Sequence, residues 1–216
     1  MKIDYALLNQ YVYEGKASKV KEMVQSAIDA GNPVAEILEE GLIAGMSVLG
    51  EDFKHNIRYV PEVLIAARAM KAGQLLLKPL LTSADIQAKK KGVIVIGTVK
   101  GDLHDIGKNL VTMMAEGAGF EVYDIGIDKS DNDFVEAALK YNADIVGMSA
   151  LLTTTMPYMK TVVERFKEEK LDHIKIVIGG APINSQYAEE IKADGFGPDA
   201  ASSVNLFESL ISAKAS

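Results

Sequence analysis

The 216-residue sequence contains three histidines and no cysteine. Disulfides and thiolate metal sites are therefore excluded, and a transition-metal site must use histidine and carboxylates, or a cofactor that brings its own ligands. His55 lies in a polar stretch between predicted helices, and His173 lies in a charged stretch before a predicted strand. Both positions are typical of surface histidines. His104 differs, because it lies in a glycine-containing turn that directly follows a run of β-branched residues.

The turn around His104 places a carboxylate two residues before the ring. Asp102 can accept the second ring N–H of His104, which would fix the tautomer and raise the basicity of the other nitrogen as a ligand. Asp105 stands at the start of a predicted helix, where aspartate is a favoured cap residue, and we assign it that role. From these residues alone, His104 is a metal ligand, a catalytic base or an ordinary surface residue.

Glycines lie at the ends of three predicted strands. Gly101 follows the first, Gly147 precedes Ser149 at the end of the third, and Gly179 and Gly180 end the fourth. The carboxyl ends of parallel strands form the edge where an α/β sheet binds ligands, and glycine lets a ligand approach the backbone closely. The three groups therefore indicate a binding edge, with ordinary turn glycines as the alternative. The sequence has no phosphate-loop motif and no tight Gly-x-Gly-x-x-Gly, which disfavours a nucleoside triphosphate or dinucleotide.

The elements that must position these residues follow two patterns. Residues 1–82 carry apolar residues at helical spacing and show no strand signal, which predicts an all-α cap bundle of four helices. Residues 83–91 are polar and non-periodic, which predicts an interdomain linker. Residues 92–216 alternate strands and helices, which predicts an α/β, flavodoxin-like (Rossmann-like) five-stranded parallel sheet. Strands are expected at 93–98, 120–125, 144–149, 174–178 and 196–200, and helices at 106–118, 131–141, 155–169, 184–193 and 203–213.

Composition limits the partners. The net charge is −7 and no basic run is longer than Lys89-Lys90-Lys91, which argues against nucleic acid as the main partner. No apolar run approaches the roughly 20 residues that cross a bilayer, so no membrane association is expected. The first ten residues lack the apolar segment of a signal peptide, and we expect the cytoplasm.

Three short motifs resemble the cobalamin-binding signature Asp-x-His-x-x-Gly, Ser-x-Leu and Gly-Gly. Their spacing also fits, with 41 residues between the first two (148 − 107) and 27 between the last two (178 − 151). The predicted bundle at 1–82 resembles the cap domain of corrinoid methyl carriers. Nearly the whole chain is thus similar to the corrinoid proteins of methanol, methylamine and methoxyarene methyltransferase systems, akin to the cobalamin module of methionine synthase. The motifs are Asp102-Leu103-His104-Asp105-Ile106-Gly107, Ser149-Ala150-Leu151 and Gly179-Gly180.

The resemblance implies a lower ligand for cobalt. His104 would bind the metal of a cobalamin or related corrinoid and replace the cofactor's own benzimidazole, which is base-off binding. Asp102 would bond to the other ring nitrogen, and Ser149 would extend that relay. The rest of the first motif, namely Asp105, Ile106 and Gly107, would lie beside the cofactor.

The resemblance also implies two further contacts with the cofactor. The displaced nucleotide tail would enter a slot beside Ser149, Leu151 and the glycine pair at 179–180. The helical bundle would cover the upper corrin face, with Tyr59 and Val60 as the candidate contacts.

The function implied is that of a methyl carrier. Such a protein accepts a methyl group on Co(I) from a substrate-specific methyltransferase and passes it to a second methyltransferase, with a reductive activator as a further partner. The chain is too short to hold either active site as well, so no catalysis is expected from it alone.

Other readings stay open. A cobalamin-binding subunit of an adenosylcobalamin-dependent mutase shares the signature but usually lacks such a bundle. A B12-sensing module normally carries a DNA-binding domain, for which this acidic chain shows no basic recognition helix. A receiver-like domain without cofactor should carry an aspartate where this chain has Ser149.

Overall fold

The computed structural model describes residues 3–80 and 91–214, which fall into two compact units. The predicted linker at 83–91 lies outside the described residues except for Lys91, and the predicted domain boundaries stay predictions. Each unit is described by itself. The units comprise residues 3–80 with 113–119, and residues 91–112 with 120–214.

Between residues 3 and 80, the described part of the N-terminal unit consists of helices joined by short turns and contains no strand. This confirms the predicted helical cap. The third predicted helix differs, because it changes from α-helix to π-helix and back while running from Val34 to Lys54. Gly41 in the π-helical part packs against α1, and a Cβ there would lie 2.5 Å from Leu8 Cδ2. The helices are α1 (Tyr5–Tyr13), α2 (Ala17–Asp29), α3 (Val34–Glu36), η1 (Ile37–Ile43), α4 (Ala44–Lys54) and α5 (Val60–Leu77).

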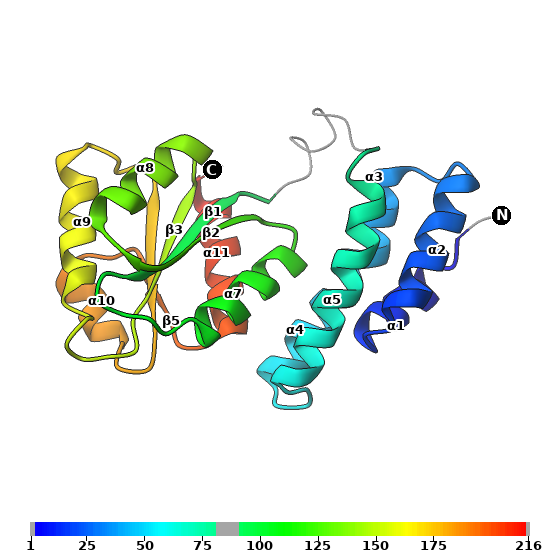
Figure 1. The fold of residues 1–216 in the computed structure, drawn as a ribbon, viewed down its shortest axis with the longest axis horizontal. Coiled ribbons are helices and arrows are strands. Elements are labelled where there is room, and N and C mark those ends of the chain that lie inside the picture. Colours follow the sequence, from blue (N-terminus) through cyan, green and yellow to red (C-terminus); the bar gives the residue numbers. More distant parts are fainter. Residues whose placement is uncertain (1–2, 81–90, 215–216) are drawn as a thin grey trace. The chain divides into compact units, whose positions relative to one another are not determined.

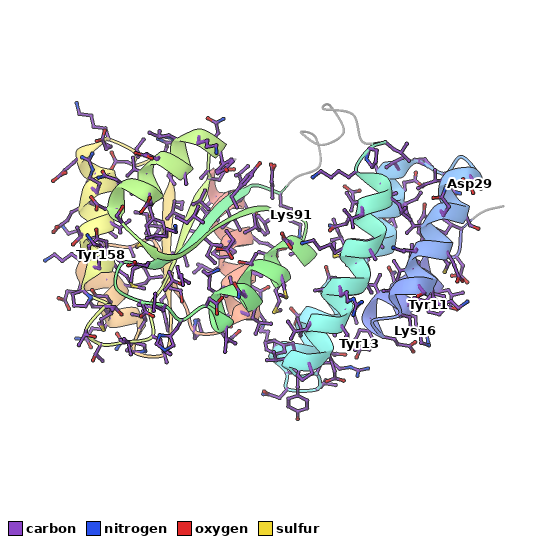
Figure 2. All side chains as sticks on the ribbon, in the orientation of Figure 1. Tyr11, Tyr13, Lys16, Asp29, Lys91 and Tyr158 are labelled. Carbon is purple, nitrogen blue, oxygen red and sulfur yellow. The ribbon has the colours of Figure 1, made fainter. Side chains whose placement is uncertain are left out.

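A polar cluster fixes the turn between α4 and α5. The Tyr13 hydroxyl of α1, labelled in Figure 2, donates to Asp52 and accepts a hydrogen bond from Arg58 Nε at 2.9 Å. Arg58 also pairs with Glu62, whose carboxylate accepts the Tyr59 N–H at 2.9 Å. Because Glu62 lies in the first turn of α5, the same cluster also starts that helix.

The described part of the second unit is built on a parallel sheet of five strands in the order β2-β1-β3-β4-β5. This order confirms the predicted flavodoxin-like fold. Helices α8 (Asp131–Tyr141), α9 (Tyr158–Glu168) and α10 (Ser185–Ile191) lie on one side of the sheet, and α7 (Ile106–Gly117) and α11 (Ala200–Lys214) lie on the other (Figure 1). All seven residues of β1 are buried, as expected for a central strand covered on both faces. The strands are β1 (Val93–Val99), β2 (Glu121–Lys129), β3 (Ile145–Ser149), β4 (Lys175–Gly179) and β5 (Gly195–Gly197).

Several predicted elements have different bounds. The strand expected at 120–125 spans Glu121–Lys129, and the helix expected at 155–169 spans Tyr158–Glu168. The fifth strand is shorter than expected and ends at Gly197, and the last helix begins at Ala200. The reason is a cap: the Asp199 side chain accepts the Ser202 N–H at 2.8 Å, which starts the helix earlier than its apolar pattern indicates. Among the described residues, no helix is long and apolar enough to cross a membrane. The helices are α7 (Ile106–Gly117), α8 (Asp131–Tyr141), α9 (Tyr158–Glu168), α10 (Ser185–Ile191) and α11 (Ala200–Lys214).

The backbone after β4 passes unusually close to the backbone after β3. The Ala150 N–H donates to the Gly179 carbonyl at 3.2 Å, and Gly180 follows with φ +131°. A Cβ on Gly180 would lie only 1.8 Å from the Ala150 carbonyl oxygen. Glycine is therefore required here by the packing of the protein itself.

We expect Gly180→Ala to lower the free energy of unfolding by at least about 2 kcal/mol, because it combines backbone strain with a clash against backbone. Gly126→Ala is the matched control, since φ is +92° there but the nearest atom, Lys129 Cε, is 3.5 Å away and mobile. Urea denaturation of both variants makes the comparison. Equal losses would show that strain alone, without the clash, explains the glycine.

Candidate functional site

The predicted site lies in the loop between β1 and α7. β1 pairs with β2 on one side and with β3 on the other, so its carboxyl end is the switch point of the sheet. The loop carries Asp102 and His104 between Val99 and Ile106. The buried Thr98 hydroxyl donates to the His104 carbonyl at 2.9 Å, which ties the middle of the loop back to the strand.

Asp102 is fully buried, and both of its oxygens accept hydrogen bonds. Oδ1 accepts the backbone N–H of His104 at 3.1 Å and lies 2.8 Å from His104 Nδ1. Oδ2 accepts the Thr155 hydroxyl at 2.6 Å. The N–H groups of Leu151 and Leu152 complete the set, at 2.8 and 3.3 Å from Oδ2. Groups from two separate loops therefore converge on one carboxylate.

These bonds keep Asp102 ionised. Burial alone would raise its pKa, but the bonds from Thr155, the Leu151 N–H and His104 outweigh burial and hold the pKa of this carboxyl well below its usual range. An ionised carboxylate can only accept, so His104 must donate its Nδ1–H to Asp102. The lone pair of the ring is then on Nε2, which is the nitrogen free to bind a metal.

The surface around His104 is open and apolar. The His104 side chain is 51% exposed although its partner Asp102 is buried. Ile106 is 81% exposed and Leu103 is 66% exposed on the same loop. A Cβ on Gly107 would meet no atom of the described residues within 4 Å, so no contact in the described part of the chain requires glycine at this position of α7. We call Leu103, Ile106, Leu151 and Leu152 the apolar shelf; the last two are 43% and 42% exposed.

Comparison with known families decides what kind of protein carries this site. A family model described as a B12 binding domain matches residues 92–205, and a second model with the same description matches residues 6–78. The first match alone covers more than half of the chain. This chain belongs to the family of B12-binding corrinoid proteins.

Three known proteins are similar to this chain over most of their length. Dimethylamine corrinoid protein 2 of Methanosarcina acetivorans is 41% identical over 208 residues, which is 96% of this chain and 95% of that protein. A cobalamin-binding protein of Desulfitobacterium hafniense superposes with a TM-score of 0.78 at 32% identity, covering 97% of this chain and 99% of that one. The methanol:cobalamin methyltransferase complex MtaBC of Methanosarcina barkeri superposes with a TM-score of 0.87 at 29% identity, covering 95% of this chain and 78% of that one.

The residues present fit a corrinoid. A corrin is a broad, largely apolar ring with a metal at its centre. The apolar shelf consists of exposed side chains beside His104 in the sequence and on the segment whose N–H groups bind Asp102. Nε2 of His104 can bind the metal. Apolar side chains exposed together at a sheet edge indicate a ligand surface. Gly107 supports the same interpretation, because a helix-destabilising residue stands where the protein leaves open space.

A hydroxyl that the sequence did not predict donates to Asp102, and the relay role of Ser149 stays a prediction. Asp102 and His104 lie at hydrogen-bonding distance as expected, but Thr155 is the side-chain hydroxyl that donates to Asp102. Among the described residues, no hydrogen bond joins the Ser149 side chain to Asp102. Ser149 lies at the end of β3, where its Cα pairs with those of Thr98 and Gly179.

The other predicted residues have these places. Asp105 precedes α7, its carbonyl accepts the Asn109 N–H at 2.7 Å, and its carboxylate accepts the Asn109 side-chain amide at 3.0 Å. Leu151 contributes its N–H to Asp102 and its side chain to the apolar shelf. Tyr59, 62% exposed, and Val60, 38% exposed, begin α5 in the N-terminal unit. Their contact with a corrin stays a prediction, as does the nucleotide slot beside Gly179 and Gly180.

Two threonines of this site were not predicted from the sequence. Thr155 is one of three consecutive threonines, and Thr98 reads as an ordinary strand residue. No usable sequence signal marks Thr155, because the predicted helix at 155–169 begins at this residue, whereas Thr155 lies in the turn between β3 and α9.

We expect Thr155→Val to lower the free energy of unfolding by about 2 kcal/mol at pH 7, because a buried carboxylate loses a hydroxyl donor. Since the hydroxyl holds the pKa of folded Asp102 down, its benefit is full above the unfolded value of about 4 and is lost only as the pH falls from there through the lowered pKa of the folded chain. Urea denaturation over a series of pH values from 7 down to the lowest at which the chain stays folded tests this, with Thr155→Ser as the control that keeps the hydroxyl. A difference of the same size at every pH would assign the effect to packing instead.

Proposed function

We propose that this chain is a corrinoid methyl carrier. It accepts a methyl group from a substrate-specific methyltransferase and passes it to a second methyltransferase, and a reductive activator restores it when the cofactor is oxidised. The observation that carries this proposal is His104, held by the ionised Asp102 and presented on the apolar shelf.

The names of related proteins support the choice of partners. The similar Methanosarcina acetivorans protein is named a dimethylamine corrinoid protein, and the similar Methanosarcina barkeri chain comes from a methyltransferase complex. Another similar chain is the monomethylamine corrinoid protein of Methanosarcina barkeri, at 31% identity. A methylamine, with dimethylamine first, is therefore the donor that we propose.

His104 would be the lower axial ligand of a corrinoid bound base-off. When bound, the corrinoid supplies a cobalt ion that takes up and releases the methyl group. Asp102 holds the proton on His104 Nδ1 and so keeps the lone pair on Nε2 for the metal.

The upper face would be covered by the N-terminal bundle. The second B12-binding match, over residues 6–78, supports a role for the bundle in holding the cofactor. Ile57, Tyr59 and Leu64 are exposed at or near the start of α5, at 61%, 62% and 42%. We propose that this apolar end of the bundle, fixed by the Tyr13 and Arg58 cluster, covers the face where the methyl group is carried.

Binding of hydroxocobalamin to the full chain tests the ligand assignment. We expect His104→Ala to abolish the imidazole-ligated absorption spectrum and to weaken binding by roughly 10-fold or more, because the metal loses its protein ligand. His173→Ala is the matched control, since His173 is exposed and lies away from the loop in sequence. An imidazole-ligated spectrum that persists in His104→Ala would show that another group binds the metal.

Transfer assays test the carrier function. The reconstituted chain, reduced chemically, is incubated with a dimethylamine-dependent methyltransferase and its substrate, and methylation is followed by absorption. We expect methylation with the wild type, and little with Asp102→Ala, because the ring of His104 is then no longer oriented. Binding of adenosylcobalamin with support of a carbon-skeleton rearrangement, and no methylation by any methylamine donor, would instead assign the chain to a mutase.

A further inference from the structure

Strand β2 lies beside the His104 loop at the edge of the sheet and is irregular only where the loop begins. From Ile96 to Val99, β1 advances by three residues, while its partner β2 advances by five, from Asp124 to Lys129. Such bulges bend a strand and re-aim its side chains, and they are common beside functional sites. Gly126 and Asp128 within this stretch have positive φ, at +92° and +54°. Two extra residues therefore turn the end of β2 towards the loop.

Asp128 uses this conformation to hold the first half of the loop. Its Oδ1 accepts the Gly101 N–H at 2.7 Å, and its own N–H donates to the Asp102 carbonyl at 3.1 Å. The two bonds bracket the peptide that joins Gly101 to Asp102. Gly101 itself has φ +83°, so the chain must turn sharply just before the carboxylate that orients His104. Aspartate is one of the few residues that tolerate the left-handed conformation that this double contact requires.

Asp124 holds the helical end of the loop through a buried lysine. Lys108, in the first turn of α7, is only 3% exposed, and its ammonium pairs with Asp124 of β2. A buried ammonium needs such a partner, because an unpaired buried charge is costly. Lys108 Nζ also donates to Asn109 Oδ1 at 2.8 Å, and Asn109 Nδ2 reaches Asp105 Oδ2 at 3.0 Å. A chain of polar contacts thus runs from β2 to the residue next to His104.

We infer that β2 positions the loop that carries His104, through Asp128 at the start of the loop and through Asp124 and Lys108 at its end. Asp128 and Asp124 are positioning residues, because neither bonds to His104. The inference rests on the proposed function for its effect on the cofactor, but the positioning itself is a property of the chain alone.

Variants at position 128 separate the acceptor from the backbone conformation. Asp128→Gly keeps the positive φ and removes the carboxylate, whereas Asp128→Asn keeps an acceptor oxygen and tolerates the same φ. Asp194→Ala is the matched control. Like Asp128, the Asp194 carboxylate accepts a backbone N–H, that of Ile176 at 2.8 Å, but it does so near the start of β4, where it also pairs with Lys175.

Hydrogen exchange of the apo chain is the first measurement. We expect amides between Gly101 and His104 to exchange about 10-fold faster in Asp128→Gly, because the loop loses its anchor, and near the wild-type rate in Asp128→Asn. Asp194→Ala should leave these amides unchanged. Unchanged exchange in Asp128→Gly, or acceleration as large in Asp194→Ala, would overturn the inference.

Binding of hydroxocobalamin is the second measurement. We expect the dissociation constant to rise about 10-fold in Asp128→Gly, with a smaller fraction of imidazole-ligated spectrum at saturation, and both to recover in Asp128→Asn. Lys108→Met, which fills the same buried space without charge, should give a similar loss from the other end of the loop. A purely structural role would lower the melting temperature in both variants but leave the spectrum at saturation unchanged, and that result would overturn the inference.

The two proposals fail in different ways. A wild-type chain that never shows an imidazole-ligated spectrum would refute the ligand role of His104, whatever the variants do. A wild type with that spectrum, together with an Asp128→Gly variant that matches it in affinity, spectrum and exchange, would refute the role of β2 only.

Discussion

The site depends on a single buried charge. A carboxylate removed from water is strongly unfavourable unless donors replace the lost hydration, and Asp102 has donors from its own loop and from the turn after β3. These two segments are far apart in sequence but adjacent in space, because β1 and β3 are neighbours in the sheet. The strand order of the fold is therefore a condition for the ionised Asp102, and the ionised Asp102 is a condition for the orientation of the His104 ring.

The surroundings of His104 divide into a polar side and an apolar side. On the polar side, Asp102, Thr98 and Thr155 are buried and hydrogen-bonded, and these bonds hold the loop and the His104 ring in place. On the apolar side, the side chains of the apolar shelf are exposed and can adjust to a bound ligand. A corrinoid needs both properties. Its metal requires one oriented donor atom, here His104 Nε2, whereas its large planar macrocycle requires only an apolar surface.

The sequence predicted the fold and the centre of the site for different reasons. The strands and helices were accessible because β-branched runs and helical apolar spacing are local patterns, and Asp102 with His104 was accessible because the two residues are close along the chain. Thr155 was not, because its contact with Asp102 arises only when β3 lies beside β1. The bulged end of β2 was not predicted either. The positive φ of Asp128 depends on its contact with Gly101, which is distant in sequence, and not on the residues next to it. The π-helical turn of η1 was missed because its apolar residues continue the pattern of the flanking α-helices.

The apolar shelf links the amount of the protein in the cell to the supply of its cofactor. Ile106 and Leu103 leave apolar surface exposed to water, and the open space beside Gly107 leaves room for a ligand. A ligand that binds only the folded form adds stability in proportion to the logarithm of its concentration, about 4 kcal/mol at 1,000 times its dissociation constant. Proteolysis removes the unfolded fraction continuously, so the steady-state amount of such a chain follows the supply of its cofactor. A shortage of corrinoid would then lower the number of chains in the cell as well as the fraction of them that hold the cofactor.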